Sequence, residues 1–276
     1  MQRSLNFLDL YFYSIFLGFE AIGRGLITKE SIKRILCPMD PSRFYELPRV
    51  GNAMELKGRQ RVLDLSSPKL LVCFLAQQYP VIDFYAIEKS EEELQAWQEI
   101  APKLKNLFLS KDDATKLSFP NGYFDKVYSV SVIEHINLKR ANGDSKAIKE
   151  VDRVLKRGGR FIFTTMISNS FRNEYRDRDI YSDKGNKEKK TFFCRVYDYK
   201  NLRKRVLEIK NFRVLKEEVC NYRFPVYESI FNKLVPYSVI YGFLHVIIAP
   251  LMIKTEKNMK KINKRAEYFA VLEKRS

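Results

Sequence analysis

The amino-acid sequence predicts an α/β protein with a mostly parallel sheet that carries helices on both faces. Between residues 60 and 167, short apolar segments of strand length alternate with longer segments of helical character. This alternation is typical of parallel strands joined by crossover helices. The chain has 276 residues, of which 45% are hydrophobic, so it can bury one large core. We expect seven strands and an apolar helical insertion before the last of them.

The expected elements follow one another in order along the chain. Strands are expected at residues 61–65, 81–87, 107–109, 125–132, 160–164, 212–220 and 268–272. Helices are expected at 69–78, 91–104, 145–155 and 199–209. Arg157, Gly158 and Gly159 are expected to end the third helix, because glycine accepts the left-handed backbone of a helix end. The polar stretch 171–190 is expected to be a surface loop or lid.

We expect three parts in the chain. These are an N-terminal helical cap (1–60), the α/β domain (61–223 and 266–276) and an apolar, basic helical insertion (224–265). Residues 5–22 of the cap are apolar nearly all round. Asp9 and Glu20 interrupt this run, and such acidic interruptions are not typical of a signal peptide. This segment is either a buried capping helix or a helix that touches a membrane or a hydrophobic substrate.

The insertion contains a twenty-residue stretch, 234–253, without any Asp, Glu, Lys or Arg. Its length would suffice to span a membrane, but Pro236, Gly242 and Pro250 interrupt it. A single span would also separate the strand expected at 268–272 from its sheet. We therefore expect bent helices that lie on a membrane or form a lid, with packing in the core or at a dimer interface as the alternative. Oligomeric state stays open.

The net charge of +17 is concentrated near the C-terminal end of the chain. Residues 168–276 hold 25 basic and 13 acidic side chains. Such a surface attracts nucleic acid or anionic lipid. The four cysteines form no C-x-x-C pair and only two histidines are present, so we expect no metal site. Scattered cysteines favour a reducing compartment, and we expect the cytoplasm, with peripheral contact at the inner face of the membrane through 234–265.

Candidate binding residues follow three of the expected strands, where ligands bind in open parallel sheets. After the first strand, Ser67 and Pro68 are expected to start a helix whose free amides, with Lys69, attract an anion. Glu88 ends the second strand, where a carboxylate can accept both hydroxyls of a ribose. After the third strand, Asp113 can accept from the exocyclic amine of adenine.

Two longer motifs resemble those of class I S-adenosylmethionine-dependent methyltransferases, in the branch that modifies small molecules and quinone-like or lipid-like acceptors. The first runs from Asp113-Ala-Thr-Lys-Leu-Ser-Phe-Pro through Phe124-Asp125 to Glu134-His135. The second is Glu150-Val-Asp-Arg-Val-Leu-Lys-Arg-Gly-Gly159. The resemblance covers roughly residues 60–167 and implies a Rossmann-like methyltransferase fold with S-adenosylmethionine as cofactor.

The resemblance also implies roles for single residues. The cofactor's methionine part would face Asp64, Ser66 and Ser67, its ribose Glu88, its adenine Asp113 and Ala114, and its sulfonium Val130 and Ser131. Glu134 and His135 would stand where the acceptor approaches, with His135 as the candidate general base because of its ordinary pKa of about 6.5.

One motif departs from the family. The first motif is normally D-x-G-x-G-x-G, whereas this chain has Asp64-Leu-Ser-Ser-Pro-Lys-Leu70 without glycine. Glycine allows positive φ and close approach of a ligand, while Pro68 has a fixed φ. We expect the cofactor to be held by hydroxyl and helix-terminus contacts instead, and the alternative is a lost or altered cofactor site.

The favoured function is methyl transfer from S-adenosylmethionine to a small, hydrophobic or membrane-borne acceptor. The alternative from another class is a degenerate methyltransferase fold that acts as a membrane-associated partner protein. RNA or DNA methylation is less favoured, since no Asn/Asp-Pro-Pro-Tyr/Phe motif follows the fourth strand. The absence of G-x-G-x-x-G after the first strand disfavours a nicotinamide reductase.

Overall fold

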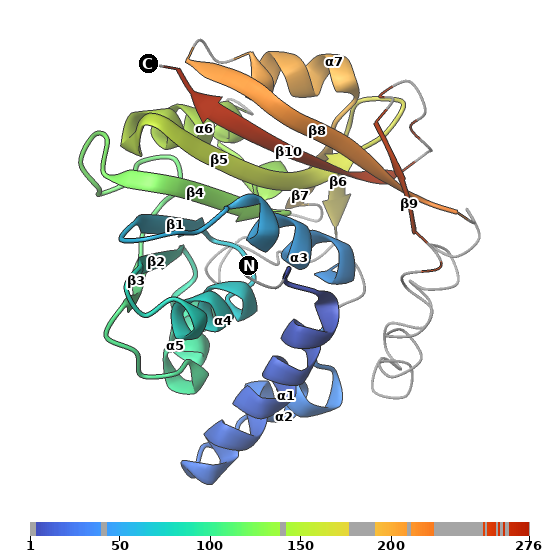
Figure 1. Cartoon of the computed structure of the whole chain (residues 1–276). Coiled ribbons are helices and arrows are strands. Elements are labelled where there is room, and N and C mark those ends of the chain that lie inside the picture. Colours follow the sequence, from blue (N-terminus) through green and yellow to red (C-terminus); the bar gives the residue numbers. More distant parts are fainter. Residues whose placement is uncertain are drawn as a thin grey trace.

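The computed structural model describes residues 4–39, 43–138, 142–176, 191–208, 211–223, 251, 253–257, 259, 262 and 265–275. The central strands are β1 (Arg61–Leu65), β2 (Asp83–Glu88), β3 (Leu107–Lys111), β4 (Phe124–Val130), β5 (Leu155–Ile167), β8 (Phe212–Tyr222), β9 (Ile253–Glu256) and β10 (Ala266–Lys274). They form one sheet in the order β3-β2-β1-β4-β5-β10-β8-β9 (Figure 1). The first five strands of that order are parallel, β10 is antiparallel to β5 and β8, and β9 is antiparallel to β8. The predicted α/β class and mostly parallel sheet are confirmed.

Helices cover both faces of this sheet. They are α1 (Phe7–Gly23), α2 (Lys29–Leu36), α3 (Arg43–Ala53), α4 (Leu70–Gln78), α5 (Glu91–Ile100), α6 (Gly143–Val154) and α7 (Tyr199–Leu202). Side chains of β1 alternate between two cores: Val62 packs with α4 residues such as Leu71, whereas Leu63 packs with α6 residues such as Ile148. Accordingly α3 and α4 lie on one face and α6 and α7 on the other (Figure 1).

The first two helices form a hairpin beside the domain, and α1 begins at a capping box made by Asn6 and Asp9. One side of α1 is buried through Leu10, Leu17 and Ala21. The predicted helix at 5–22 is therefore confirmed, and it is buried on one side. None of the helices in the described part of the chain has the length and apolar character needed to cross a bilayer.

Two predicted boundaries are wrong. The third crossover helix, α6, ends at Val154, and Gly158 and Gly159 lie inside β5 instead of closing the helix. The reason is an irregular start of β5, where Leu155 pairs with β4 before a register shift and Gly158 takes a φ of +70°. The predicted helix at 199–209 ends earlier than expected: it consists of α7, up to Leu202, followed by a π-helical turn, Arg203–Leu207.

Two regions predicted without strands contain them. Within the predicted loop 171–190, Arg172–Arg176 forms β6, which pairs with β7 (Thr191–Val196) in a separate two-stranded sheet. The side chains of β6 are mostly polar and do not show the apolar alternation that predicts a strand, because this two-stranded sheet lies outside the main sheet. Residues 224–250 of the predicted insertion lie outside the described residues. Its later part is not wholly helical, since Ile253–Glu256 forms β9 and makes an eighth strand where seven were predicted.

Asp144 anchors the segment that follows β4 and so positions the candidate site. It is fully buried and accepts hydrogen bonds from the Tyr197 hydroxyl at 2.8 Å and from Arg205 at 2.7 Å. Replacing Asp144 by Ala should lower the free energy of unfolding by about 3–5 kcal/mol, because it removes the carboxylate that lies 3.9 Å from the buried Arg195 and pairs with Arg205. Denaturant titration would measure this loss, and a loss below about 1 kcal/mol would contradict the assignment.

Candidate active site

The turn after β1 joins the carboxyl ends of β1 and β4. Asp64 is fully buried, and its Oδ1 accepts a hydrogen bond from the Ser67 amide at 2.7 Å. The Ser67 hydroxyl accepts from the Val130 amide at 2.9 Å, and α4 begins only at Leu70. The prediction that Ser67 caps a helix starting at Pro68 is therefore wrong, because the backbone of β4 uses the Ser67 hydroxyl.

Ser66 lies within this turn at a φ of +55°, in the left-handed region that favours glycine. The glycine-free turn therefore keeps a backbone conformation of the kind glycine allows, at a cost of about 1–2 kcal/mol for a non-glycine residue. Ser131, directly after β4, also has a positive φ of +50°. Strained backbone at two neighbouring strand ends is typical of functional sites.

Lys69 is buried between the candidate acids. Its side chain is 2% exposed, and its Nζ donates to the Ser67 carbonyl oxygen at 2.7 Å. The same Nζ lies 3.5 Å from Glu88 Oε2 and 3.9 Å from Asp64 Oδ2. Burial raises the pKa of Asp64 to about 6, and the Lys69 charge opposes that rise. The ammonium predicted to attract an anion is thus already shared by two of the chain's own carboxylates.

Glu88 and Asp113 lie at the ends of neighbouring strands, as predicted. The Glu88 Oε1 accepts from the amides of Lys89 and Ser90 at 2.8 and 3.2 Å, which holds the carboxylate in place. Asp113 Oδ1 accepts from the amide and hydroxyl of Thr115, both at 2.8 Å. Its Oδ2 pairs with the exposed Lys89 at 3.1 Å, and solvent readily replaces such a surface pair.

On the other side of the turn, α3 covers the ends of β4 and β5. Glu46 of α3 is fully buried, and its Oε1 accepts hydrogen bonds from the hydroxyls of Ser131 and Thr164. Its Oε2 pairs with Arg43 at 2.5 Å. Ser131, predicted to line the sulfonium, therefore contacts a carboxylate of the N-terminal cap. Sequence analysis did not identify Glu46, and the available signal was an acid within the apolar run Phe44–Leu47.

Glu134 and His135 lie in a 3-10 turn, Ile133–His135, that follows β4. Glu134 is fully buried, and its Oε2 accepts from the Thr165 hydroxyl at 2.9 Å. Its Oε1 has no hydrogen-bond partner among the described residues. Burial raises the pKa of Glu134 to about 7. The same cause lowers the pKa of His135 to about 4, and its Nδ1 is 2.7 Å from the Phe193 carbonyl oxygen.

A third carboxyl belongs to this cluster. Burial raises the pKa of Glu267 in β10 well above its usual range, and the nearby Glu46 and Glu134 carboxylates add to the shift. Sequence analysis passed over Glu267, although an acid within an apolar strand was a usable signal. Glu46, Glu134 and Glu267 thus gather three carboxyls near the carboxyl ends of β4 and β5, beyond the turn that carries Ser67.

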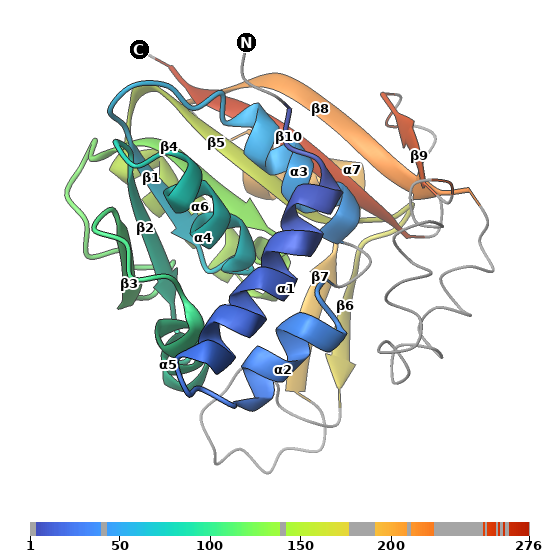
Figure 2. The ribbon, with the colours of Figure 1, turned by 60° about the horizontal axis from the view of Figure 1, so that its bottom comes forward.

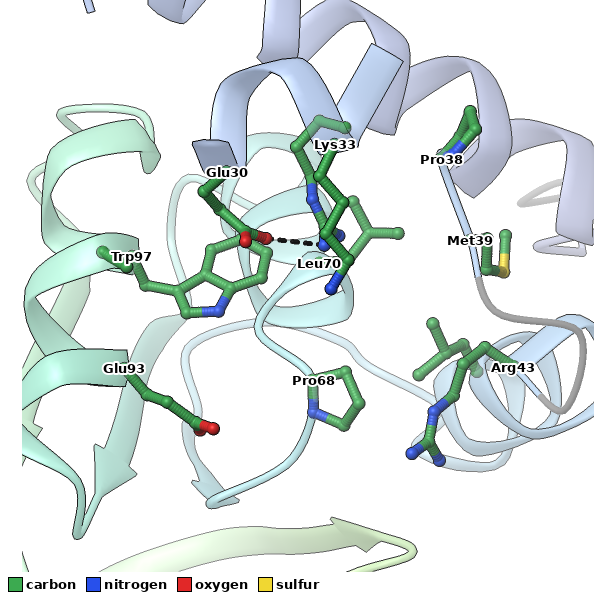
Figure 3. Close-up of a pocket in the computed structure, with 12 residues that line it drawn as sticks. Glu30, Lys33, Pro38, Met39, Arg43, Pro68, Leu70, Glu93 and Trp97 are labelled. Atoms are coloured by element: carbon green, nitrogen blue, oxygen red, sulfur yellow. Dashed lines mark ion pairs between the residues drawn. The ribbon is translucent and has the colours of Figure 1, made fainter. Parts of the chain in front are cut away.

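A pocket opens beside the same turn, between α2, α3 and α5 (Figure 3). Pro68 of the turn lies there between Glu93 of α5 and Arg43 of α3, with Trp97 and Glu30 above them (Figure 3). Its volume is about 210 Å³. Pockets for drug-sized ligands usually measure about 300–1,000 Å³, so this one holds only part of such a ligand in the present arrangement.

A family model described as "Methyltransferase domain" matches residues 63–163. This segment contains the turn after β1 as well as Glu88 and Asp113. This segment is a methyltransferase domain, and the chain has the fold of class I S-adenosylmethionine-dependent methyltransferases. No curated protein sequence matches this chain.

Solved structures show that the methyltransferase shares its fold with distant proteins. It is 15% identical to the YcgJ protein from Bacillus subtilis, with 83% of this chain and 98% of that one covered and a TM-score of 0.53. MccD protein is 16% identical over 85% and 98% of the two chains, with a TM-score of 0.52. Coclaurine N-methyltransferase, whose structure is bound to N-methylheliamine and SAH, is 12% identical over 83% and 69%, with a TM-score of 0.53.

The donor groups of this methyltransferase fit the nucleoside half of its cofactor. Glu88 presents a carboxylate for two hydroxyls, and Asp113 is 39% exposed and can accept from an exocyclic amine. Ser66 provides the positive φ that the family's glycine would provide. The Lys69 ammonium is the exception, because it must leave Glu88 Oε2 before a ribose can reach that atom.

Proposed function

We propose that this methyltransferase methylates a small, hydrophobic or membrane-borne acceptor whose nucleophilic atom arrives protonated, with Glu134 as general base. The observation that carries the proposal is the Glu134 carboxyl, which is fully buried and has an Oε1 without a partner among the described residues. A general base works best when its pKa is near the working pH, and burial raises the pKa of Glu134 to about 7.

The cofactor's parts would contact residues of three strand ends. Glu88 would hold the ribose, Asp113 and Ala114 the adenine, and the turn from Asp64 to Ser67 the methionine part. Bound S-adenosylmethionine supplies an electrophilic methyl group. The chain's task is then to align the acceptor and exclude water, which the coverage of the strand ends by α3 favours.

The proton would pass from the acceptor to Glu134. Thr165 donates to Glu134 Oε2 at 2.9 Å, so Oε1, which has no partner in the described part of the chain, would accept the proton. His135 suits this role less well than sequence analysis predicted, because a base with a pKa of about 4 binds a proton weakly near neutrality. Glu46, paired with Arg43, would position Ser131 and Thr164 through the hydrogen bonds that it accepts from their hydroxyls.

Asp113→Ala should weaken the binding of S-adenosylhomocysteine by about 10–100-fold, the value of a lost charge-assisted hydrogen bond of about 1.5–3 kcal/mol. Isothermal titration calorimetry would measure it. Lys89→Ala is the matched control, because it removes the exposed partner of Asp113 and leaves the carboxylate in place. Unchanged affinity in Asp113→Ala would place the adenine elsewhere.

One observation favours a second candidate function. The buried Lys69 ammonium occupies the space between Asp64 and Glu88, as expected for a degenerate fold that acts as a membrane-associated partner protein. Titration of the folded chain with S-adenosylmethionine separates the two. Binding supports the enzyme, and its absence in a chain with an intact thermal transition supports the partner protein.

A further inference from the structure

The outer side of α1 is an apolar stripe. Leu8, Phe12, Phe16 and Phe19 follow one another at helical spacing and are 38%, 63%, 51% and 60% exposed. Within α1, which the structure describes in full, Asp9 and Glu20 are only half-exposed, and Glu20 borders the stripe one turn after Phe16. Large exposed apolar patches on soluble proteins usually mark an interaction site.

The fold of α1 does not require this stripe. The opposite side supplies Leu10, Leu17 and Ala21 to the core, whereas Phe12 and Phe16 contact only the rim of that core, through the rings of Tyr11 and Tyr13. Polar side chains at positions 12, 16 and 19 would leave the core contacts unchanged. Phe12, Phe16 and Phe19 are nevertheless more than half exposed among the described residues, which suits contact with an apolar partner.

The apolar surface continues onto α2, which lies beside α1 (Figure 2). The two helices approach closely at Gly18, where an added Cβ would meet Ile35 Cγ1 at 2.5 Å. Ile32 and Leu36, on either side of Ile35 in the sequence, are 42% and 48% exposed, and Ile27 in the connecting turn is 72% exposed. We define the hairpin face by its exposed side chains Phe12, Phe16, Phe19, Ile27, Ile32 and Leu36.

The charged residues around the hairpin face indicate which kind of partner binds there. The exposed Lys29 and Lys33 share α2 with Ile32 and Leu36, and the chain carries a net charge of +17. A second copy docked on this face would bring two strongly positive molecules together, whereas an anionic bilayer attracts the same charge. Apolar side chains bordered by lysines match the boundary between lipid headgroups and acyl chains.

We propose that the hairpin face lies on an anionic membrane surface, with α1 parallel to the bilayer plane and its phenylalanines in the headgroup–acyl boundary. Lys29 and Lys33 contact lipid phosphates. This inference rests on the proposed function for the nature of the acceptor, which would be drawn from the bilayer, but the binding experiment needs no catalysis.

Sedimentation of the full chain with phosphatidylcholine vesicles, with and without phosphatidylglycerol, tests the proposal. We expect binding that depends on phosphatidylglycerol and falls at least about tenfold in Phe12→Ser/Phe16→Ser/Phe19→Ser. The matched control, Val81→Ser/Val214→Ser/Leu215→Ser, removes three exposed apolar side chains from other surfaces and should bind like the wild type. Lys29→Glu/Lys33→Glu should lose the preference for phosphatidylglycerol.

Three results would overturn the proposal. They are a wild-type chain that does not bind the vesicles, a stripe variant that binds as well as the wild type, and a wild-type dimer that the stripe variant converts to a monomer. The last result would make a second copy the occupant. Thermal transitions of all variants verify folding, and cofactor titration of the same samples separates a failure of the proposed function from a failure of membrane docking.

Discussion

Glu134→Gln is expected to lower the rate of methyl transfer by about 10²–10⁴-fold, the usual contribution of general base catalysis. The amide keeps the size of the side chain and its contact with Thr165 but cannot take up a proton. In the wild type, kcat/KM should rise about tenfold per pH unit up to pH 7 and level off above it, because only the carboxylate form of Glu134 accepts the acceptor's proton. The variant should lack this rise. Release of S-adenosylhomocysteine with a hydrophobic acceptor found by screening would measure both.

Two further variants show whether the titrating group is Glu134. Thr165→Val removes a hydrogen bond that favours the charged form of the carboxyl, so the midpoint should move to higher pH while the plateau is retained. His135→Asn should leave the midpoint near 7, because His135 has a pKa of about 4 and is neutral throughout this range. A midpoint that persists in Glu134→Gln and disappears in His135→Asn would refute the assignment.

The fold could be predicted largely from the sequence because its signals are local. The strand at Arg61–Leu65 was predicted to the residue, since a buried parallel strand is a short apolar run between turns. Predictions failed where the decisive interaction comes from another part of the chain. The Ser67 hydroxyl accepts from the backbone of β4 instead of capping a helix. The polar segment Arg172–Arg176 forms a strand although its apolar residues do not alternate.

Sequence analysis placed Glu88, Asp113 and Glu134 near the carboxyl ends of their strands, where the structure has them, but it missed Glu46 and Glu267. Glu88 and Asp113 are recognisable because Glu88 ends one strand and Asp113 lies two residues after another, and parallel strands bring their carboxyl ends together. Glu46 and Glu267 come from α3 and β10, at positions that only the packing of the cap and the antiparallel strand brings near Glu134. The spacing of motifs along the sequence does not reveal such contacts.

Lys69→Ala is expected to raise the affinity for S-adenosylhomocysteine by about 10–100-fold. The buried ammonium donates to the Ser67 carbonyl oxygen at 2.7 Å and lies 3.5 Å from the oxygen of Glu88 that a ribose would need. Breaking a hydrogen bond made by a charged group costs about 1.5–3 kcal/mol, and the wild type must meet this cost whenever the cofactor binds. The variant has no ammonium to displace. Titration calorimetry with S-adenosylhomocysteine avoids any effect of the sulfonium charge.

Lys69→Ala should also make the chain less stable. Tighter binding by a less stable variant would distinguish a direct effect at the site from a general change in stability. Without Lys69, the fully buried Asp64 loses a positive charge that opposes the rise of its pKa, so Asp64 is neutral over a wider pH range. We therefore expect tighter binding together with a lower thermal midpoint. Lys89→Ala, which removes the exposed ammonium beside Asp113, should change neither the affinity nor the thermal midpoint by much. Weaker binding in Lys69→Ala would make the ammonium a ligand of the cofactor, and unchanged binding would place the ribose away from Glu88.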